Sequence, residues 1–169
     1  IADTDGRSGE ATVRKNKSGI VVKGLHDLAV RFSRCCNPVP GDEIVGFVTR
    51  GRGVSIHRTD CINVINLPED ERGRLIDAEW QVAENPTSTE QYSTEIQIFA
   101  NNRIGLFADI SKVFTEKQID ITSMNVRTSK QGRATIIMTF DIHGTEELNR
   151  ITDKIRQIDG VLDIQRTTG

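Results

Sequence analysis

The second half of the chain has the most regular alternation of apolar and polar positions. Such alternation is typical of half-buried strands, and it is clear over residues 92–100; we also expect strands at residues 119–129, 132–142 and 160–167. An apolar stripe at helical spacing covers residues 105–118 and 145–158, and Thr145 is suited to be the N-cap of the second helix. The order strand, helix, strand, strand, helix, strand predicts a ferredoxin-like βαββαβ domain over residues 92–169.

The pattern before residue 82 is shorter and less regular, and it predicts a smaller α+β module over residues 19–82. Leu25, Leu28 and Phe32 recur at helix-like spacing, so we expect a short helix there. Apolar segments flank the tight turn Gly51-Arg52-Gly53, which predicts a hairpin. We also expect strands at residues 20–23 and 74–80, and a helix with Thr59 or Asp60 as its N-cap.

Two polar segments border these modules. Residues 1–18 show no apolar period, and residues 83–91 place Pro86 among polar side chains. We expect the first to be a flexible leader and the second a linker. The chain lacks an initiator methionine, so we interpret it as a fragment of a longer protein. No apolar run approaches the roughly 20 residues that span a bilayer, and the polar start does not resemble a signal peptide, so we expect neither feature.

Composition and charge narrow the class of protein. The chain has 169 residues, of which 36% are hydrophobic and 27% charged, as in soluble globular proteins. Three cysteines, an odd number, argue against a secreted disulfide framework and for a reducing cytoplasm. The net charge of -2 conceals a split: residues 12–61 carry nine Lys/Arg and four Asp/Glu, whereas residues 62–169 carry twelve and seventeen. The basic module is therefore the candidate for contact with nucleic acid.

The basic module also holds a cysteine–histidine cluster, made of Cys35, Cys36, His57 and Cys61. The expected hairpin returns the histidine towards the cysteine pair, and three sulfurs with one imidazole match a tetrahedral Cys3His zinc site. A domain of this size with few large apolar side chains often needs a metal or a partner to fold. Two other interpretations stay open: the thiols are small buried hydrophobes, or a cysteine–histidine pair is a nucleophile.

Arginines around the cluster predict contact with the phosphate backbone of RNA. They are Arg34, Arg50, Arg52 and Arg58, and the hairpin turn would project two of them from a tight bend. A solvated basic surface without a partner is the other interpretation of these residues.

The loop before the first helix of the second module is a candidate site for a small anion. Gly105 joins the preceding strand to this helix. The free N–H groups at a helix start favour an anionic group, for instance the carboxylate of an amino acid. Asn101 and Asn102 could accept hydrogen bonds from its ammonium group. A plain strand–helix turn with a permissive glycine explains the same residues.

Two longer motifs carry a family resemblance. Residues 34–61, RCCNPVPGDEIVGFVTRGRGVSIHRTDC, closely resemble the zinc-finger-like (ribosome-intersubunit) domain of the long RelA/SpoT-type enzymes, which make and degrade (p)ppGpp. Residues 98–126, IFANNRIGLFADISKVFTEKQIDITSMNV, are similar to the ACT domain of these enzymes. The resemblance implies that this fragment is the C-terminal regulatory region of a bifunctional GTP pyrophosphokinase and (p)ppGpp hydrolase. It also implies that the catalytic domains lie upstream and that the fragment alone catalyses nothing.

The resemblance implies ligands and partners as well. It assigns zinc binding to Cys35, Cys36, His57 and Cys61, and it places the basic hairpin against ribosomal RNA and an uncharged tRNA in the A site. It assigns a branched-chain amino acid to the loop of Asn101, Asn102, Ile104, Gly105 and Leu106, and implies a homodimer through the ACT domain. Two alternatives remain: a structural dimerisation module without ligand or RNA binding, and a small thiol-dependent enzyme.

Overall fold

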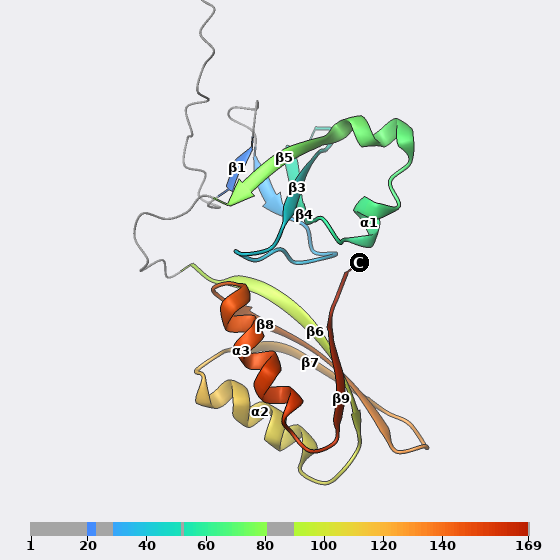
Figure 1. Cartoon of the computed structure of the whole chain (residues 1–169), viewed down its shortest axis with the longest axis vertical. Coiled ribbons are helices and arrows are strands. Elements are labelled where there is room, and N and C mark those ends of the chain that lie inside the picture. The colour runs from blue at the N-terminus through green and yellow to red at the C-terminus, as the bar shows by residue number, and fades with distance from the viewer. Residues whose placement is uncertain (1–19, 23–28, 52, 81–89, 169) are drawn as a thin grey trace, which may run out of the picture.

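The computed structural model describes residues 20–22, 29–51, 53–80 and 90–168. Their elements form two modules, stacked along the longest axis of the molecule (Figure 1). The expected leader, Arg52 and all but the end of the expected linker lie outside the described residues. No helix in the described parts of the chain is both long and apolar enough to cross a membrane.

The first module is a five-stranded sheet with two short helical segments beside it. The strand order is β1-β5-β3-β4-β2, and neighbours are antiparallel except for the parallel pair β2 and β4. The strands are β1 (Ile20–Val22), β2 (Val30–Phe32), β3 (Ile44–Val48), β4 (Val54–Arg58) and β5 (Leu75–Trp80). The chain between β4 and β5 forms the helix α1 (Ile62–Ile65) and the 3-10 helix η1 (Glu69–Arg74).

The expected helix around Phe32 is wrong for the residues that the structure describes. Val30–Phe32 form strand β2, and residues 23–28 lie outside the described parts of the chain. Parallel pairing with β4 packs Val30 and Phe32 in one cluster with the buried Val54 and Ile56. A packing contact that is remote in sequence therefore overrides a helix-like spacing of three apolar residues.

The start of α1 also differs from the prediction, whereas the predicted hairpin is present as β3 and β4. The N-cap of α1 is Cys61, not Thr59 or Asp60. The two predicted residues form a tight turn that ends β4, in which the Cys61 N–H donates to the Arg58 carbonyl at 3.0 Å. The helix therefore begins after this turn is complete.

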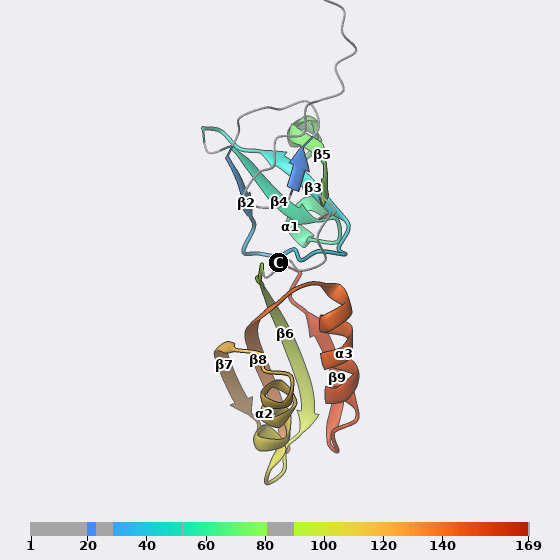
Figure 2. The same cartoon turned by 90° about the vertical axis from the view of Figure 1, so that its left-hand side faces the viewer.

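The second module has the predicted βαββαβ order. Its antiparallel sheet has the strand order β7-β8-β6-β9. The two helices α2 and α3 lie on one face of this sheet (Figures 1 and 2). The elements are β6 (Tyr92–Asn101), α2 (Leu106–Glu116), β7 (Ile121–Thr128), β8 (Arg133–Ile142), α3 (Thr145–Arg156) and β9 (Val161–Arg166). The predicted α+β fold is therefore confirmed.

Period-two burial in β6 and β8 places one face of the sheet against both helices. Alternate residues of β8, from Ala134 to Ile142, are buried, and they pack with the apolar stripes of α2 and α3. Phe114 of α2 meets Phe140 of β8 edge to face, with ring centroids 4.8 Å apart. Such burial is the main source of stability for a domain of this size.

The expected Thr145 N-cap is wrong. Gly144 is the N-cap of α3, and it makes no side-chain capping bond. The Thr145 N–H instead donates to the carbonyl of Pro40 at 2.9 Å. A carbonyl of the first module therefore satisfies one of the N–H groups that a helix start leaves free.

The two modules share a packed interface. Val39 of the first module is fully buried within the core cluster of the second. The rings of Phe32, Trp80 and Tyr92 form a three-way aromatic contact, with centroids 5.5 to 5.6 Å apart. The end of β9 reaches up to the first module, where the C-terminus lies (Figure 1). The modules are therefore joined by tertiary contacts as well as by the chain between them.

Candidate metal centre

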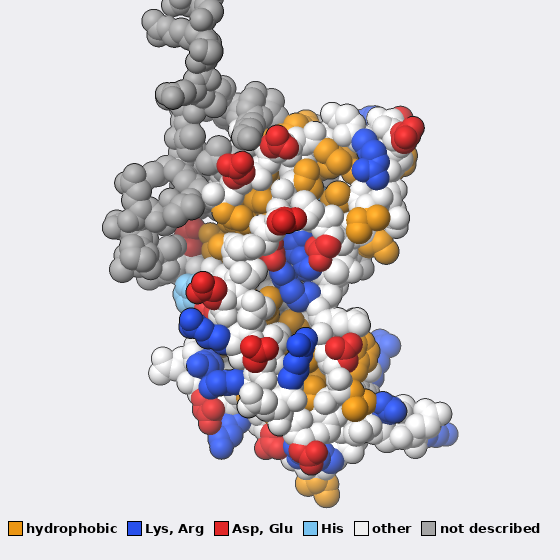
Figure 3. Space-filling model, viewed as in Figure 1, with side chains coloured by type: hydrophobic (Ala, Val, Ile, Leu, Met, Phe, Trp, Pro, Cys, Tyr) orange, Lys and Arg blue, Asp and Glu red, His pale blue; other side chains and the backbone are white. Residues whose placement is uncertain are grey.

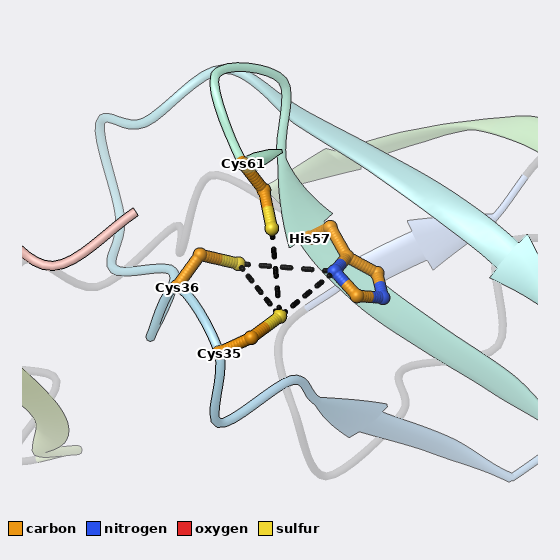
Figure 4. A group of neighbouring side chains, drawn as sticks. All are labelled: Cys35, Cys36, His57 and Cys61. Atoms are coloured by element: carbon orange, nitrogen blue, oxygen red, sulfur yellow. Dashed lines mark hydrogen bonds between the residues drawn. The ribbon is translucent and has the colours of Figure 1, made fainter. Parts of the chain in front are cut away.

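Three separate segments of the first module bring the cysteine–histidine cluster together. Cys35 and Cys36 lie in the turn that follows β2, His57 lies near the end of β4, and Cys61 is the N-cap of α1. The Ser33 N–H donates to the Ile56 carbonyl at 2.9 Å, which holds the cysteine turn beside β4. All four side chains point towards one another (Figure 4).

The distances within the cluster suit a tetrahedral ion. Cys35 Sγ lies 3.4 Å from Cys61 Sγ, 3.9 Å from Cys36 Sγ and 3.4 Å from His57 Nδ1. Cys36 Sγ lies 3.9 Å from the same nitrogen, and all four donor atoms fall within 4.8 Å of one another. Zinc–sulfur bonds of about 2.3 Å in a tetrahedron put the sulfurs about 3.8 Å apart. The donor set and its spacing therefore fit zinc.

Neighbouring polar groups orient the donors. Ser55 Oγ lies 3.0 Å from His57 Nε2, so this ring nitrogen can carry the proton and leave Nδ1 free as a ligand. Ser33 Oγ lies 2.9 Å from Cys35 Sγ, and the Arg58 N–H donates to Cys36 Sγ at 3.3 Å. Such hydrogen bonds favour thiolates. Neither serine was among the predicted site residues, because a serine two residues from a ligand has no distinctive spacing.

Burial and hydrogen bonds act differently on the four ionisable groups. Burial raises the pKa of Cys36 and of Cys61 and lowers the pKa of His57. Burial also raises the pKa of Cys35, but hydrogen bonds from Ser33, from Asn63 and from the other two thiols outweigh it, so its net pKa is lowered. The lowered pKa of His57 favours its neutral form, which is the form that binds a metal. Cys35 is also the one partly exposed thiol of the three.

The predicted RNA-contacting arginines are not gathered on one surface. Arg50 lies at the β3–β4 turn with 85% of its side chain exposed, 3.9 Å from Glu71. Arg34 is exposed but follows β2, and the parallel pairing of β2 with β4 puts it at the opposite end of the hairpin. Arg58 is only 6% exposed and bonded to Asp60. Arg52 lies outside the described residues.

The distribution of charged side chains on the surface agrees with the separation of these arginines. On the face of the molecule shown in Figure 3, basic and acidic side chains are interspersed over both modules. The described residues on that face therefore form no continuous basic field.

In the predicted amino-acid loop, some backbone groups are held by hydrogen bonds and one side chain is fully exposed. The Asn101 and Asn102 N–H groups donate to the carbonyls of Gly160 and Gly132 at 2.7 and 2.8 Å. Ile104 is fully exposed, whereas Leu106 is fully buried in the core. Gly105, the N-cap of α2, has a φ of +83°, which favours glycine.

Arg103, which the sequence did not single out, organises this loop. It donates to Asp109 Oδ2 at 2.7 Å and to the Asp159 carbonyl at 2.8 Å. These three residues come from separate elements, so no short spacing in the sequence marks them.

Comparison with known proteins identifies both modules. Residues 20–81 match the RelA/SpoT RIS domain, and residues 88–166 match the ACT domain. This chain consists of a RelA/SpoT RIS domain followed by an ACT domain. The first match contains all four donors of the cluster, and the second contains the whole βαββαβ sheet. The family resemblance of the two sequence motifs is thus confirmed.

The relatives of this chain are GTP pyrophosphokinases. It is 40% identical over 150 residues to one from Streptomyces coelicolor and 36% identical over 156 residues to one from Escherichia coli K12. The alignments cover 89% and 92% of this chain but 17% and 20% of the relatives, so the chain spans about a fifth of their length. The solved ACT domain from the GTP pyrophosphokinase of Chlorobium tepidum aligns with 46% of this chain and 99% of its own, at 22% identity and a TM-score of 0.42.

Proposed function

We propose that this chain is the C-terminal regulatory region of a cytoplasmic GTP pyrophosphokinase and (p)ppGpp hydrolase. In this proposal it reports the state of the ribosome and the supply of amino acids to catalytic domains upstream in the same polypeptide. The observation that carries it is the convergence of the four donors, at tetrahedral spacing, within a RIS domain that is packed against an ACT domain. Neither domain match is to a catalytic domain, so the fragment acts by binding.

The metal in this proposal is structural. Cys35, Cys36, His57 and Cys61 hold zinc in a closed site, since all four positions are protein ligands. The ion supplies cross-links between the turn after β2, strand β4 and helix α1. Among its described residues the RIS domain has small cores, of which the largest has four fully or nearly buried apolar residues, Ile20, Val54, Ile56 and Ala78. A domain with so little buried apolar surface gains most from such a cross-link.

The RNA contact in this proposal is made by exposed arginines of the RIS domain. Arg50 and Arg34 are exposed at opposite ends of the β3–β4 hairpin, with Arg52 beside Arg50 in the sequence. They would contact ribosomal RNA and an uncharged tRNA in the A site at two separate points. Arg58 takes no part, because its guanidinium group is buried and bonded within the protein.

The ACT domain in this proposal binds a branched-chain amino acid at the loop from Asn101 to Leu106. The helix start at Gly105 favours a carboxylate. The fully exposed Ile104 offers an apolar contact for a branched side chain. Two ACT domains pair through their sheets in a homodimer.

Ribosome co-sedimentation tests the RNA contact. The full chain should bind ribosomes with uncharged tRNA in the A site, and the double variant Arg34→Ala/Arg50→Ala should bind more weakly. The slope of log affinity against log salt is negative, and its magnitude should decrease by about 0.7 to 0.9 for each lost phosphate contact. The matched control is Arg127→Ala/Arg133→Ala, which removes two exposed arginines of the ACT domain.

Equal effects of the two double variants would contradict an RNA contact through the RIS arginines. Calorimetry with valine and isoleucine tests the ACT ligand, with leucine and aspartate for comparison. A zinc-loaded, folded chain that binds neither ribosomes nor any of these amino acids would contradict the proposed function as a whole.

A second function, a dimerisation module without other ligands, is favoured by one observation. Strand β7 is an edge of the ACT sheet, and all its residues except Ile121 are exposed, including Met124 and Val126. Such an edge is a template for pairing with a second chain. Sedimentation that finds a concentration-independent dimer without RNA or amino-acid affinity would support this function instead.

A further inference from the structure

The segment that follows the cysteine pair inserts into the ACT domain. Val39 is buried in the ACT core, and the Pro40 carbonyl accepts the first N–H of α3. Gly41 has a φ of +101°, and a Cβ there would lie 2.0 Å from Thr145 Oγ1. A side chain at this position would therefore force Thr145 to shift, and the positive φ would strain it as well. Residues 37–42, the docking turn, thus connect the cluster directly to the ACT domain.

A partly buried ion pair closes the docking turn. The two terminal guanidinium nitrogens of Arg166, at the end of β9, donate to the two carboxylate oxygens of Asp42, at 2.6 and 3.0 Å. The side chains are only 18% and 9% exposed. Asp42 also accepts the Val39 N–H at 2.8 Å, and Arg166 donates to the Asn37 carbonyl at 3.2 Å. The pair therefore holds both ends of the docking turn against the ACT sheet.

The C-terminal residues of the ACT domain bind back to the other two ligand segments. The buried guanidinium group of Arg58 donates to the carbonyls of both Cys36 and Thr167 at 3.3 Å. The Ile62 N–H, in the first turn of α1, donates to the Thr168 carbonyl at 2.8 Å. Residues 167–168 thus reach the RIS domain at two points.

In each of the three segments that carry the proposed metal ligands, the residues directly after the ligand therefore contact the ACT domain. The docking turn follows Cys36, Arg58 follows His57, and Ile62 follows Cys61. We propose that metal occupancy of the RIS cluster and docking of the ACT domain are linked, so that each strengthens the other. This inference rests on the proposed metal binding and adds to it a conformational role for the ion.

The direction of the linkage follows from the geometry. The ACT domain contacts all three segments, so docking requires that they keep fixed positions relative to one another. Bound metal fixes the donor atoms of all three segments to a single point, whereas in the metal-free protein the segments are joined by hydrogen bonds alone, among them those between the sulfurs and the imidazole. Fixing them in advance lowers the entropy lost on docking. Linkage is reciprocal, so the docked ACT domain must raise metal affinity by the same factor.

The first test measures zinc affinity of the full chain by competition with a chromophoric chelator. Arg166→Met removes the ion pair across the interface and should weaken zinc binding at least tenfold. The matched control is Arg103→Met, which removes an ion pair with Asp109 inside the ACT domain and should leave zinc affinity unchanged. Asp42→Asn breaks the interface pair from the other side, and it replaces Arg166→Met if that variant does not fold.

The second test measures amide hydrogen exchange before and after zinc is removed from the wild-type chain. Exchange should accelerate at the Thr145 N–H, which donates across the interface to Pro40. It should stay slow at the Asn101 N–H, which donates to Gly160 within the ACT domain.

A null result in either test overturns the inference, because a linkage cannot act in one direction only. Unchanged zinc affinity in both interface variants is such a result, and so is unchanged exchange at Thr145. A wild-type chain that binds no zinc gives a different outcome. It refutes the proposed metal site itself, and with it the linkage.

Discussion

Shortening Val39 to alanine tests whether the two domains share a core. Val39 belongs to the RIS domain in sequence but is fully buried among ACT residues. The substitution removes two methyl groups, each worth about 0.8 kcal/mol of transfer free energy. The space left unfilled adds to this loss, so the free energy of unfolding should fall by about 2 to 3 kcal/mol.

Urea unfolding provides the assay. With an m-value of about 2 kcal/mol per molar urea, the midpoint should fall by about 1 to 1.5 M. Trp80 is the only tryptophan of the chain, and its ring contacts Phe32 and Tyr92 at the interface, so its fluorescence reports docking. Circular dichroism reports the helices, which lie mainly in the ACT domain. The two signals should shift together, because one residue serves both domains.

The matched control is Val126→Ala, the same deletion at a residue that is 38% exposed on the edge strand β7. It should lower the free energy of unfolding by about 0.5 kcal/mol or less, because the position is at the surface. This loss is much smaller than the one expected for Val39→Ala. Equal costs for the two variants would refute the shared core. So would a Val39→Ala chain in which only the fluorescence transition moves, since the ACT domain would then be independent of the docking turn.

Three further predictions concern the docking turn and the cluster. Gly41→Ala should destabilise the chain by about 2 to 4 kcal/mol, because it combines a left-handed backbone with a clash against Thr145. Gly51→Ala, which also has a positive φ but open space around it, should cost only about 1 to 2 kcal/mol in the same urea assay. Iodoacetamide should modify Cys35 first in the metal-free chain, since it is the partly exposed thiol with the lowered pKa. Mass spectrometry should show that zinc prevents this modification, and equal labelling of all three thiols would contradict the described geometry. Zinc affinity should rise with pH near neutrality, because burial raises the pKa of Cys36 and Cys61 and their protons must leave on binding. Calorimetry in buffers of different ionisation enthalpy measures this proton release, and its absence would show that these thiols are not ligands.

The ACT fold could be predicted because its signal is local and long. Strands β6 and β8 alternate over ten residues each, and the apolar stripes of α2 and α3 are of matching length. The RIS strands have three to six residues, which is too short for periodicity to separate a strand from a helix. Strand β2 in particular exists because of a parallel pairing with a segment more than twenty residues away.

The clustering of the three cysteines and His57 could be predicted, because the expected hairpin returns His57 towards the cysteine pair. The environment of the cluster could not, since it depends on contacts between side chains without a distinctive spacing and, for Arg58, on a contact with the other domain. Arg58 shows this most clearly: its sequence neighbours indicated an RNA contact, yet its guanidinium group is buried between Cys36 and Thr167. Val39 shows it too, because a turn rich in proline and glycine gave no sign that one of its residues belongs to the core of another domain.

The metal content of the purified chain tests the account most directly. Elemental analysis after dialysis should find close to one zinc per chain, and Cys36→Ser should lose that zinc and the protection of the Thr145 amide together. A wild-type chain that is free of metal, fully folded and docked would contradict the account.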